Sequence, residues 1–420
     1  MKQLIIQGGK KLYGSIAISG SKNASLPILA ASLLIDEIII LRNIPNVKDI
    51  LTMKTLLESI GKKIEFNILK NEIKIYPTKI KKLEALYSLV KTMRAGVLVL
   101  GPLIAKYNFA RVSLPGGCAI GSRPVDLHIE ALKKMGAKIK IEKGYIVAEA
   151  SKKLKSAKIK FSSISVGATE NLIMAATLCK GKTIIQNIAI EPEILDLINF
   201  LNCSGAKISF VSKRSIVIEG VDKLRGINYS VIPDRIEAGT YAVAALITNG
   251  KITLNKINRE MMSNIFKILK KAGAKIVFGK KNSVTISRKI IKPTKIKTMP
   301  YPGFPTDMQA QLMSLLCLSK GSSLIKEEIF ENRFLHVSEL KRMGANIKIS
   351  NQSANIIGIA NLNGAEVMAT DLRASVSLVL AGLAAKGTTI INRIYHLERG
   401  YENLVSKLKQ CGAKIVLKNV

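Results

Sequence analysis

The sequence predicts an α/β fold of six repeated units, arranged as two globules of three units each around buried helices. Two recurring patterns support this prediction. A Gly-Ala-Lys-Ile segment, or a close variant of it, follows an amphipathic stretch six times. An apolar helical stretch of three or four turns recurs in phase with it. Each repeat spans about 70 residues, which is enough for a supersecondary α/β module.

The glycine of each repeated segment is predicted to end an amphipathic helix and to precede a strand. Glycine after a helix is typical of a C′ residue with positive φ, and the β-branched residues that follow are typical of a strand. These glycines are separated by 75, 69, 68, 71 and 68 residues, by subtraction of their positions. They are Gly61, Gly136, Gly205, Gly273, Gly344 and Gly412.

The apolar stretches predict six helices that are buried on every side. Each is rich in Ala, Leu, Ile and Ser and has hardly a charge past its first turn. Because a helix that is apolar all round must be covered all round, the sheets and the amphipathic helices are expected to surround these six. The predicted buried helices span residues 21–36, 92–106, 169–180, 237–249, 306–320 and 371–386.

The boundary between the two globules is predicted after the third repeat, near residues 223–233. Residues 2–18 precede the first buried helix, and we expect this strand to pair with the far end of the chain. The predicted domains are therefore residues 1–21 together with 233–420, and residues 22–232.

Composition and charge indicate a globular chain without a membrane span. Hydrophobic residues make up 48% of it, and the longest uncharged apolar runs, such as 95–105, are too short to cross a bilayer. No export signal is visible at the N-terminus, and five scattered cysteines, an odd number, favour reduced thiols in the cytoplasm. The net charge of +36 would suit nucleic acid, but the lysines are spread along the chain and aromatic residues reach only 5%. We therefore attribute most of the net charge to a general richness in lysine on solvated faces, and not to a nucleic-acid-binding surface.

Residues 115–128, Pro-Gly-Gly-Cys-Ala-Ile-Gly-Ser-Arg-Pro-Val-Asp-Leu-His, are the most distinctive segment. Their three glycines and a proline before Arg123 exclude the interior of a regular helix or strand. Cys118 lies between Arg111 and Arg123, and cationic neighbours with access to solvent make a thiol reactive. An isolated Gly-Gly-Cys would indicate only a turn, but the mixed polar and apolar residues that follow it favour a ligand contact.

Charged residues also lie at the starts of the predicted buried helices. The acidic ones, Glu237, Asp307 and Asp371, are explained as simple helix caps. Basic side chains in a first turn oppose the helix macrodipole, so Lys22, Arg94 and Arg373 predict that something anionic binds there.

Several motifs together point to one family. Besides residues 115–128, they are Gly20-Ser-Lys-Asn-Ala, Phe304-Pro-Thr-Asp-Met-Gln-Ala-Gln, Phe330-Glu-Asn-Arg-Phe and Ala369-Thr-Asp-Leu-Arg-Ala-Ser. In combination they closely resemble the enolpyruvyl transferases, and among these the UDP-N-acetylglucosamine 1-carboxyvinyltransferases, over essentially the whole chain. The resemblance implies an inside-out α/β barrel of two globular domains that close over a cleft, in agreement with the count of six repeats.

The resemblance implies transfer of the enolpyruvyl group of phosphoenolpyruvate to the 3′-hydroxyl of UDP-N-acetylglucosamine, with release of phosphate, as the first step of peptidoglycan synthesis. It implies no cofactor and no metal. Cys118 would protonate the methylene carbon, could form a covalent adduct and would be alkylated by the epoxide antibiotic fosfomycin. Asp307 would take the proton of the sugar hydroxyl. Lys22, Arg123 and Arg399 would hold phosphoenolpyruvate, whose several charges suit arginine forks.

The implied substrate-binding residues extend beyond these catalytic ones. One departs from the family's common pattern, because Ser163 stands where a lysine is usual, and backbone N–H groups of residues 165–167 would then serve the diphosphate. The full set is Lys22, Asn23, Arg94, Arg123, Pro124, Val125, Asp126, Leu127, Ser163, Ile164, Ser165, Val166, Gly167, Asp307, Ile329, Arg333, Asp371, Arg373 and Arg399.

Two alternative functions stay open at this point. A sister enzyme that uses shikimate-3-phosphate would share the fold and the phosphoenolpyruvate site but would lack the loop cysteine. A nucleic-acid-binding protein would need a concentrated basic face. No nucleic-acid or membrane partner is expected, and the oligomeric state is left open. Of the remaining residues, Cys179 and Cys317 are expected in the core. Glu191 and Glu193 are expected at an exposed turn and helix start, and a contact in the cleft is the less favoured alternative.

Overall fold

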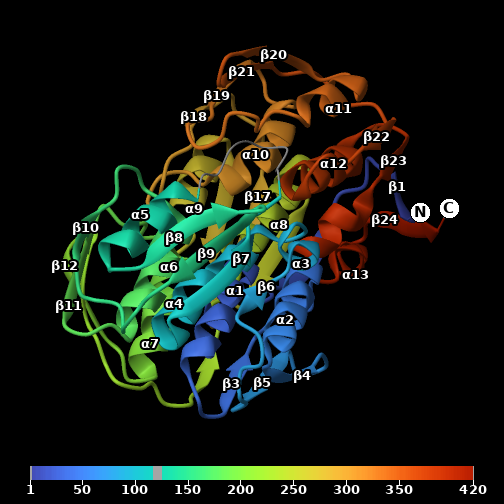
Figure 1. Ribbon diagram of the computed structural model, residues 1–420. Helices are drawn as coiled ribbons and strands as arrows, with labels where there is room; N and C mark the ends of the chain where they lie inside the picture. Colours follow the sequence, from blue (N-terminus) through green and yellow to red (C-terminus); the bar gives the residue numbers. More distant parts are fainter. Residues whose placement is uncertain (1, 117–124, 420) are drawn as a thin grey trace. The chain divides into compact units, whose positions relative to one another are not determined.

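The computed structural model describes residues 2–116 and 125–419, so the predicted site residues Cys118, Arg123 and Pro124 lie outside the described residues. The described chain divides into two compact units (Figure 1). We call residues 2–19 with 233–419 the split unit, and residues 20–116 with 125–232 the middle unit. Within the described ranges, no helix is long and apolar enough to span a bilayer.

The predicted six-fold repeat is confirmed, because the described strands form six four-stranded sheets, three in each unit. All six sheets have the same plan. One edge strand runs parallel to the second strand, which is antiparallel to the third, and the third is antiparallel to the fourth. A repeated sequence pattern therefore corresponds to a repeated sheet topology.

The strands of each sheet in the middle unit are given in order across the sheet, starting from the edge strand that pairs in parallel. The first contains β14 (Asn228–Ser230), β3 (Ile39–Arg42), β5 (Glu72–Tyr76) and β4 (Lys63–Asn67). The second contains β6 (Glu84–Ala85), β7 (Phe109–Ser113), β9 (Tyr145–Glu149) and β8 (Lys138–Glu142). The third contains β10 (Lys158–Lys160), β11 (Lys182–Gln186), β13 (Ser215–Glu219) and β12 (Lys207–Ser212).

The split unit has three corresponding sheets. The first contains β2 (Tyr13–Ala17), β15 (Lys251–Asn255), β17 (Val284–Arg288) and β16 (Ala274–Phe278). The second contains β18 (Lys295–Lys297), β19 (Ser322–Lys326), β21 (Ser353–Ile357) and β20 (Asn346–Ser350). The third contains β22 (Glu366–Met368), β23 (Thr388–Asn392), β1 (Lys2–Gln7) and β24 (Lys414–Asn419).

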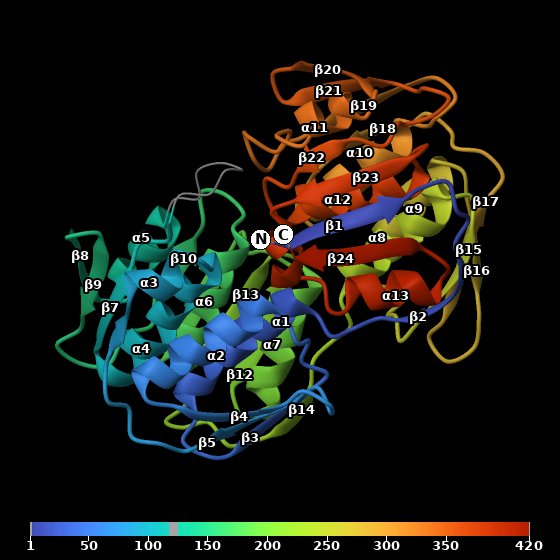
Figure 2. The same ribbon diagram turned by 90° about the vertical axis from the view of Figure 1, so that its right-hand side faces the viewer.

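Strand β1 pairs with the far end of the chain, as predicted. Figure 2 shows it between β23 and β24, and the register places Leu4 opposite both Ile391 and Leu417. The prediction of one strand over residues 2–18 was wrong, however. A positive φ angle at Gly9 accompanies a break over residues 8–12, and β2 joins a different sheet, parallel to β15.

Three buried helical segments pack against one another in each unit. In the split unit α8, α10 and α12 contact each other, and in the middle unit α6 contacts α1, η2 and α4. The segments are α1 (Lys22–Ala31) with η1 (Ser32–Leu34), η2 (Arg94–Val99) with α4 (Leu100–Tyr107), α6 (Val166–Thr177), α8 (Arg235–Ile247), η3 (Thr306–Met308) with α10 (Gln309–Leu316), and α12 (Leu372–Ala384).

The second of these segments differs from the continuous helix predicted over 92–106. Its first half is the 3₁₀ helix η2, and α4 begins only at Leu100. Pro102 accounts for the change, because it has no N–H to bond back to the carbonyl of Leu98 and is tolerated only near the start of a new helix.

The amphipathic helices end as the glycine pattern predicted. Each of the six glycines that follow them has a positive φ, between 91° at Gly344 and 130° at Gly61. The helices are α2 (Lys48–Ile60), α5 (Asp126–Lys134), α7 (Pro192–Cys203), α9 (Ser263–Lys271), α11 (Val337–Arg342) and α13 (Leu404–Gln410). Two short helical segments complete the described chain, α3 (Tyr87–Val90) and η4 (Ile394–Arg399).

Candidate active site

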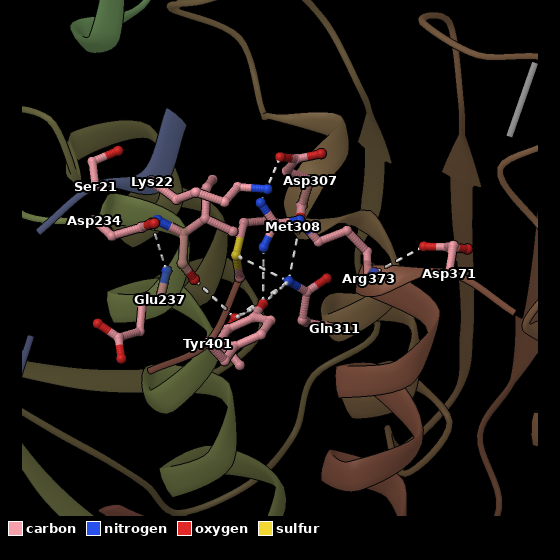
Figure 3. Close-up of polar contacts among 12 residues, drawn as sticks. Ser21, Lys22, Asp234, Glu237, Asp307, Met308, Gln311, Asp371, Arg373 and Tyr401 are labelled. Carbon is pink, nitrogen blue, oxygen red and sulfur yellow. Dashed lines mark hydrogen bonds and ion pairs between the residues drawn. The ribbon is translucent and has the colours of Figure 1, made fainter. Parts of the chain in front are cut away.

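A carboxylate held by two buried arginines forms the centre of the candidate site in the split unit. Arg333 Nη2 donates to Asp307 Oδ1 at 2.8 Å. Arg373 Nη2 donates to Asp307 Oδ2 at 2.7 Å, and Figure 3 shows these two residues. The arginine side chains are only 4% and 6% exposed, whereas that of Asp307 is 27% exposed. The two guanidinium groups stabilise the ionised form of a carboxylate that a ligand can still reach.

The N-terminal turns of two buried helices bring these groups together. Asp307 lies in η3, directly before α10, and Arg373 lies in the first turn of α12. Burial alone would lower the pKa of Arg373, but Asp307, Tyr401 and Asp234 together outweigh it and raise the pKa above its ordinary value. Arg373 is therefore a fixed cation.

The loop that carries Ile329 is tied to the same place by Glu327. This fully buried carboxylate accepts from Thr306 Oγ1 at 3.0 Å, next to Asp307, and from the backbone N–H of Ile329 at 2.9 Å. Ile329, an implied contact of the sugar, is thus tied through Glu327 to the residue that directly precedes Asp307.

The start of α12 also holds Asp371, and the end of η4 lies against it. Asp371 is the N-cap of α12, where its carboxylate accepts from the backbone N–H groups of Arg373 and Ala374 at 2.8 and 3.1 Å. A Cβ on Gly400 would lie 2.7 Å from Leu372 Cδ2, so Gly400, which follows Arg399 at the end of η4, packs closely on the first residue of α12.

Lys22, in the middle unit, is buried together with a carboxylate partner. It is the first residue of α1, is 8% exposed, and its Nζ donates to Asp49 Oδ2 at 2.9 Å. Asp49 lies in the first turn of α2 and is 4% exposed. Ser21 caps α1 by accepting from the backbone N–H of Ala24 at 3.3 Å, which fixes the helix start beside Lys22 and Asn23.

The other implied binding residues of the middle unit lie at the starts of three packed helical segments. Arg94 is the first residue of η2, Val125 to Leu127 begin α5, and α6 begins within residues 163–167. Helix α6 contacts both α5 and η2. Ser163 is exposed, and Ser165 caps α6 through the backbone N–H of Ala168.

His128 joins two of these segments. Its Nδ1 lies 2.9 Å from Asn171 Nδ2, which also donates to the carbonyl of Val97 at 2.9 Å. Burial lowers the pKa of His128 to about 4, so the ring is neutral at neutral pH and accepts from the amide. The ring also lies 3.5 Å from where a Cβ on Gly167 would stand, so the start of α6 packs closely on it.

Lys22 and Arg373 contact carboxylates of the chain itself, so their places in a first turn do not by themselves require a bound anion, and anion binding there stays a prediction. Two other expectations from the sequence need correction. Glu237 is not a cap, because Asp234 caps α8 and Glu237 accepts from Lys407 Nζ at 2.6 Å, with a pKa that burial raises to about 7. Glu193 is not exposed but 4% accessible, in the first turn of α7.

The described cysteines are free thiols. Cys179 and Cys317 are buried, as expected, although Cys179 lies just after the end of α6 and not within it. Among the described residues, no group of three His, Cys, Asp or Glu side chains could hold a metal ion.

The sequence analysis missed the partners that hold the site residues. Asp49 shows no sequence signal beyond its place in an amphipathic helix. Gln311 and Tyr401 were visible but unassigned, one at the end of the Phe304 motif and the other two residues after Arg399. Both contact the Asp307 and Arg373 cluster (Figure 3).

Comparisons with known proteins agree with this fold and with the motifs. Residues 6–408 match the family model described as EPSP synthase (3-phosphoshikimate 1-carboxyvinyltransferase), and the chain belongs to this family of enolpyruvyl transferases. Its relatives include a UDP-N-acetylglucosamine 1-carboxyvinyltransferase of Pelagibacter ubique, 60% identical over 416 residues, and one of Endomicrobium trichonymphae, 52% identical over 418 residues. In both comparisons the match covers 99% of each chain. The resemblance inferred from the motifs is confirmed.

Solved structures give the same fold. The enolpyruvyl transferase NikO from Streptomyces tendae superimposes with a TM-score of 0.90 at 22% sequence identity, covering 100% of this chain and 99% of that one. EPSP synthase from Acinetobacter baumannii superimposes with a TM-score of 0.76 at 19% identity, covering 100% of both chains. The predicted fold class is therefore confirmed.

Proposed function

We propose that this chain transfers the enolpyruvyl group of phosphoenolpyruvate to the 3′-hydroxyl of UDP-N-acetylglucosamine, with release of phosphate, at the start of peptidoglycan synthesis. The observation that carries this conclusion is 50% to 60% identity, over 99% of each chain, to relatives named for that activity. The sister activity on shikimate-3-phosphate is the alternative, because it gives its name to the family model.

The chemistry requires an acid at carbon and a base at oxygen. As the sugar oxygen bonds to C2 of phosphoenolpyruvate, its hydroxyl proton passes to the base and C3 receives a proton from the acid. The tetrahedral adduct then loses phosphate and one C3 proton, which restores the double bond. We assign Asp307 as the base and Cys118 as the acid, and also as the site of a covalent adduct.

Asp307 suits the role of base because its carboxylate is fixed and partly exposed. The arginines hold it through one hydrogen bond to each oxygen, and the remaining lone pairs can accept a hydroxyl proton. A base must be within hydrogen-bond reach of the proton that it takes. A carboxylate held in one orientation loses little conformational freedom when it accepts that proton.

Phosphoenolpyruvate is assigned to Lys22, Arg123 and Arg399, with Asn23 beside Lys22. Lys22 supplies a buried cation that Asp49 already orients, and arginine forks match both phosphate and carboxylate. Asp49 is the counter-ion of Lys22 within the chain.

The nucleotide-sugar is assigned to residues at helix starts in the middle unit, which offer backbone N–H groups to a diphosphate. The first-turn N–H groups of Val166 and Gly167 would take the place of the lysine that is usual in the family at the position of Ser163. The remaining assigned residues are Arg94, Arg123, Pro124, Val125, Asp126, Leu127, Ile164 and Ser165, with Asp307, Ile329, Arg333, Asp371, Arg373 and Arg399.

We also propose that the reaction takes place in the cytoplasm. Cys179, Cys203, Cys317 and Cys411 are free thiols, which is typical of a reducing compartment. Fractionation with an antibody against the chain tests this assignment, and recovery with periplasmic or surface proteins would contradict it.

Phosphate release tests the reaction itself. We expect release from phosphoenolpyruvate with UDP-N-acetylglucosamine and not with shikimate-3-phosphate, and the opposite pattern would overturn the assigned acceptor. Asp307→Asn removes the base, so kcat should fall by a factor of about 10² to 10⁴. The matched control is Asp222→Asn, since the side chain of Asp222 is fully exposed, at 103%. Equal activity of the two variants would refute the role of Asp307.

A further inference from the structure

A buried chain of hydrogen bonds extends from Arg373 away from Asp307. Arg373 Nη1 donates to Tyr401 Oη at 3.1 Å, and Tyr401 Oη lies 3.0 Å from Thr240 Oγ1 (Figure 3). Tyr401 is 4% exposed and Thr240 1% exposed. The chain therefore links the start of α12 to the first turns of α8 through a phenol that follows η4.

The direction of each hydrogen bond in this chain is fixed by the donors available. Thr240 Oγ1 donates its one proton to the carbonyl of Ile236 at 2.8 Å, so toward Tyr401 it acts as an acceptor. The Tyr401 hydroxyl must then donate to Thr240, which leaves its oxygen lone pairs for Arg373. Burial raises the pKa of Tyr401, so the phenol stays neutral and keeps the proton that it donates.

A second contact ties the same phenol to the backbone of the site carboxylate. Gln311, which is fully buried, donates from Nε2 to the carbonyl of Asp307 at 2.8 Å and lies 3.4 Å from Tyr401 Oη. Tyr401 thus touches both the arginine that holds the Asp307 carboxylate and the glutamine that holds the Asp307 main chain.

We propose that Tyr401 is a positioning residue for the enolpyruvyl transfer, which fixes the Arg373 guanidinium so that it holds the Asp307 carboxylate in its reactive orientation. A guanidinium with acceptors on two of its nitrogens cannot rotate without breaking one bond, and an unpaired donor in this buried position is unfavourable. The inference rests on the proposed role of Asp307, but it assigns a further residue that does not touch the substrate.

The test replaces the phenol by the isosteric ring in Tyr401→Phe. We expect kcat for phosphate release to fall about ten-fold, because one hydrogen bond to a charged group is lost. The matched control is Tyr229→Phe, since the Tyr229 hydroxyl also makes a hydrogen bond, to Asp196 Oδ1 at 2.6 Å, but in the middle unit and outside the candidate site. A similar fall in kcat for the control would show general destabilisation and overturn the proposal.

A double-mutant cycle separates positioning from a merely structural role. Arg373→Lys replaces the fork by a single ammonium, so in that background Tyr401→Phe should change kcat less than two-fold. A second full ten-fold loss would mean that Tyr401 does not act through Arg373. If Tyr401→Phe fails to fold, Thr240→Val takes its place, with an expected loss of about three-fold because it removes the acceptor of the phenol proton.

The outcomes distinguish this inference from the proposed function. If the unmodified chain is active and Asp307→Asn is not, but Tyr401→Phe retains full kcat, only the positioning role is refuted. If the unmodified chain releases no phosphate with UDP-N-acetylglucosamine, the proposed function fails, and the role of Tyr401 fails with it.

Discussion

The buried ion pair between Lys22 and Asp49 gives the sharpest prediction about stability. Asp49→Asn keeps the shape of the side chain but leaves a cation that is 8% exposed without its charged partner. Removing one partner of a buried pair costs about 3–5 kcal/mol of unfolding free energy, and an amide that can still accept places the expected loss near 3 kcal/mol.

Urea denaturation measures this loss, and the same helix supplies the control. Lys54 and Glu58 on α2 form an ion pair at 2.7 Å whose side chains are 25% and 36% exposed. Because a solvated pair four residues apart contributes about 0.3–0.5 kcal/mol, Glu58→Gln should hardly move the denaturation midpoint. Equal losses for the two variants would refute the argument from burial.

A double replacement separates stability from activity. In Lys22→Met with Asp49→Leu no buried charge remains, and such apolar pairs are often as stable as the ion pair they replace. We expect the unfolding free energy to recover while phosphate release does not, because Lys22 is assigned to phosphoenolpyruvate. Recovery of activity would exclude that assignment.

Two further predictions concern acid and thiol chemistry. Because burial lowers the pKa of His128 to about 4, the unfolded chain binds a proton between pH 6.5 and 4 that the folded chain does not. Stability present above pH 6.5 is then lost as pH falls, by up to about 3 kcal/mol, and His128→Asn should flatten this part of the curve of unfolding free energy against pH. Fosfomycin should add one label to the chain by intact mass and none to Cys118→Ser. Burial raises the pKa of Cys179, Cys317 and Cys411, so their thiols should not react, and a label found on one of them would contradict the assignment of Cys118.

The repeated architecture could be predicted from the sequence because its signals are local. Gly412 ends its helix with a φ of 92° for the same steric reason as Gly136, so one pattern read six times gave six helix ends. The burial of the apolar helices could likewise be predicted, because it follows from their local composition. The break between β1 and β2 was missed because a run of apolar and polar residues does not say which sheet each half will join.

The candidate site could be predicted only where a residue's type indicates its chemistry. Asp307 and Arg373 stood out as charges at the starts of apolar helices, but the bond between them depends on residues 66 positions apart in the chain. Tyr401 is uncharged and lies in none of the motifs. Its proposed role could be inferred only from its hydrogen bonds with Arg373 and Thr240. That Lys22 has a carboxylate partner within the chain could not be predicted, because Asp49 lies in another helix.

The pairing of β1 with β23 and β24 has a consequence for synthesis on the ribosome. The middle unit needs nothing beyond residue 232, so its three sheets can form while the rest of the chain is still being made. Strand β1 is synthesised before the other described strands, yet its partners β23 and β24 come after all of these, so during the synthesis of the segments between them the backbone N–H and C=O groups of β1 lack the strands that pair with them. We therefore expect that β1 must be protected from wrong strand pairing in the nascent chain. An early stop codon that removes β24 should leave β1 with one exposed edge.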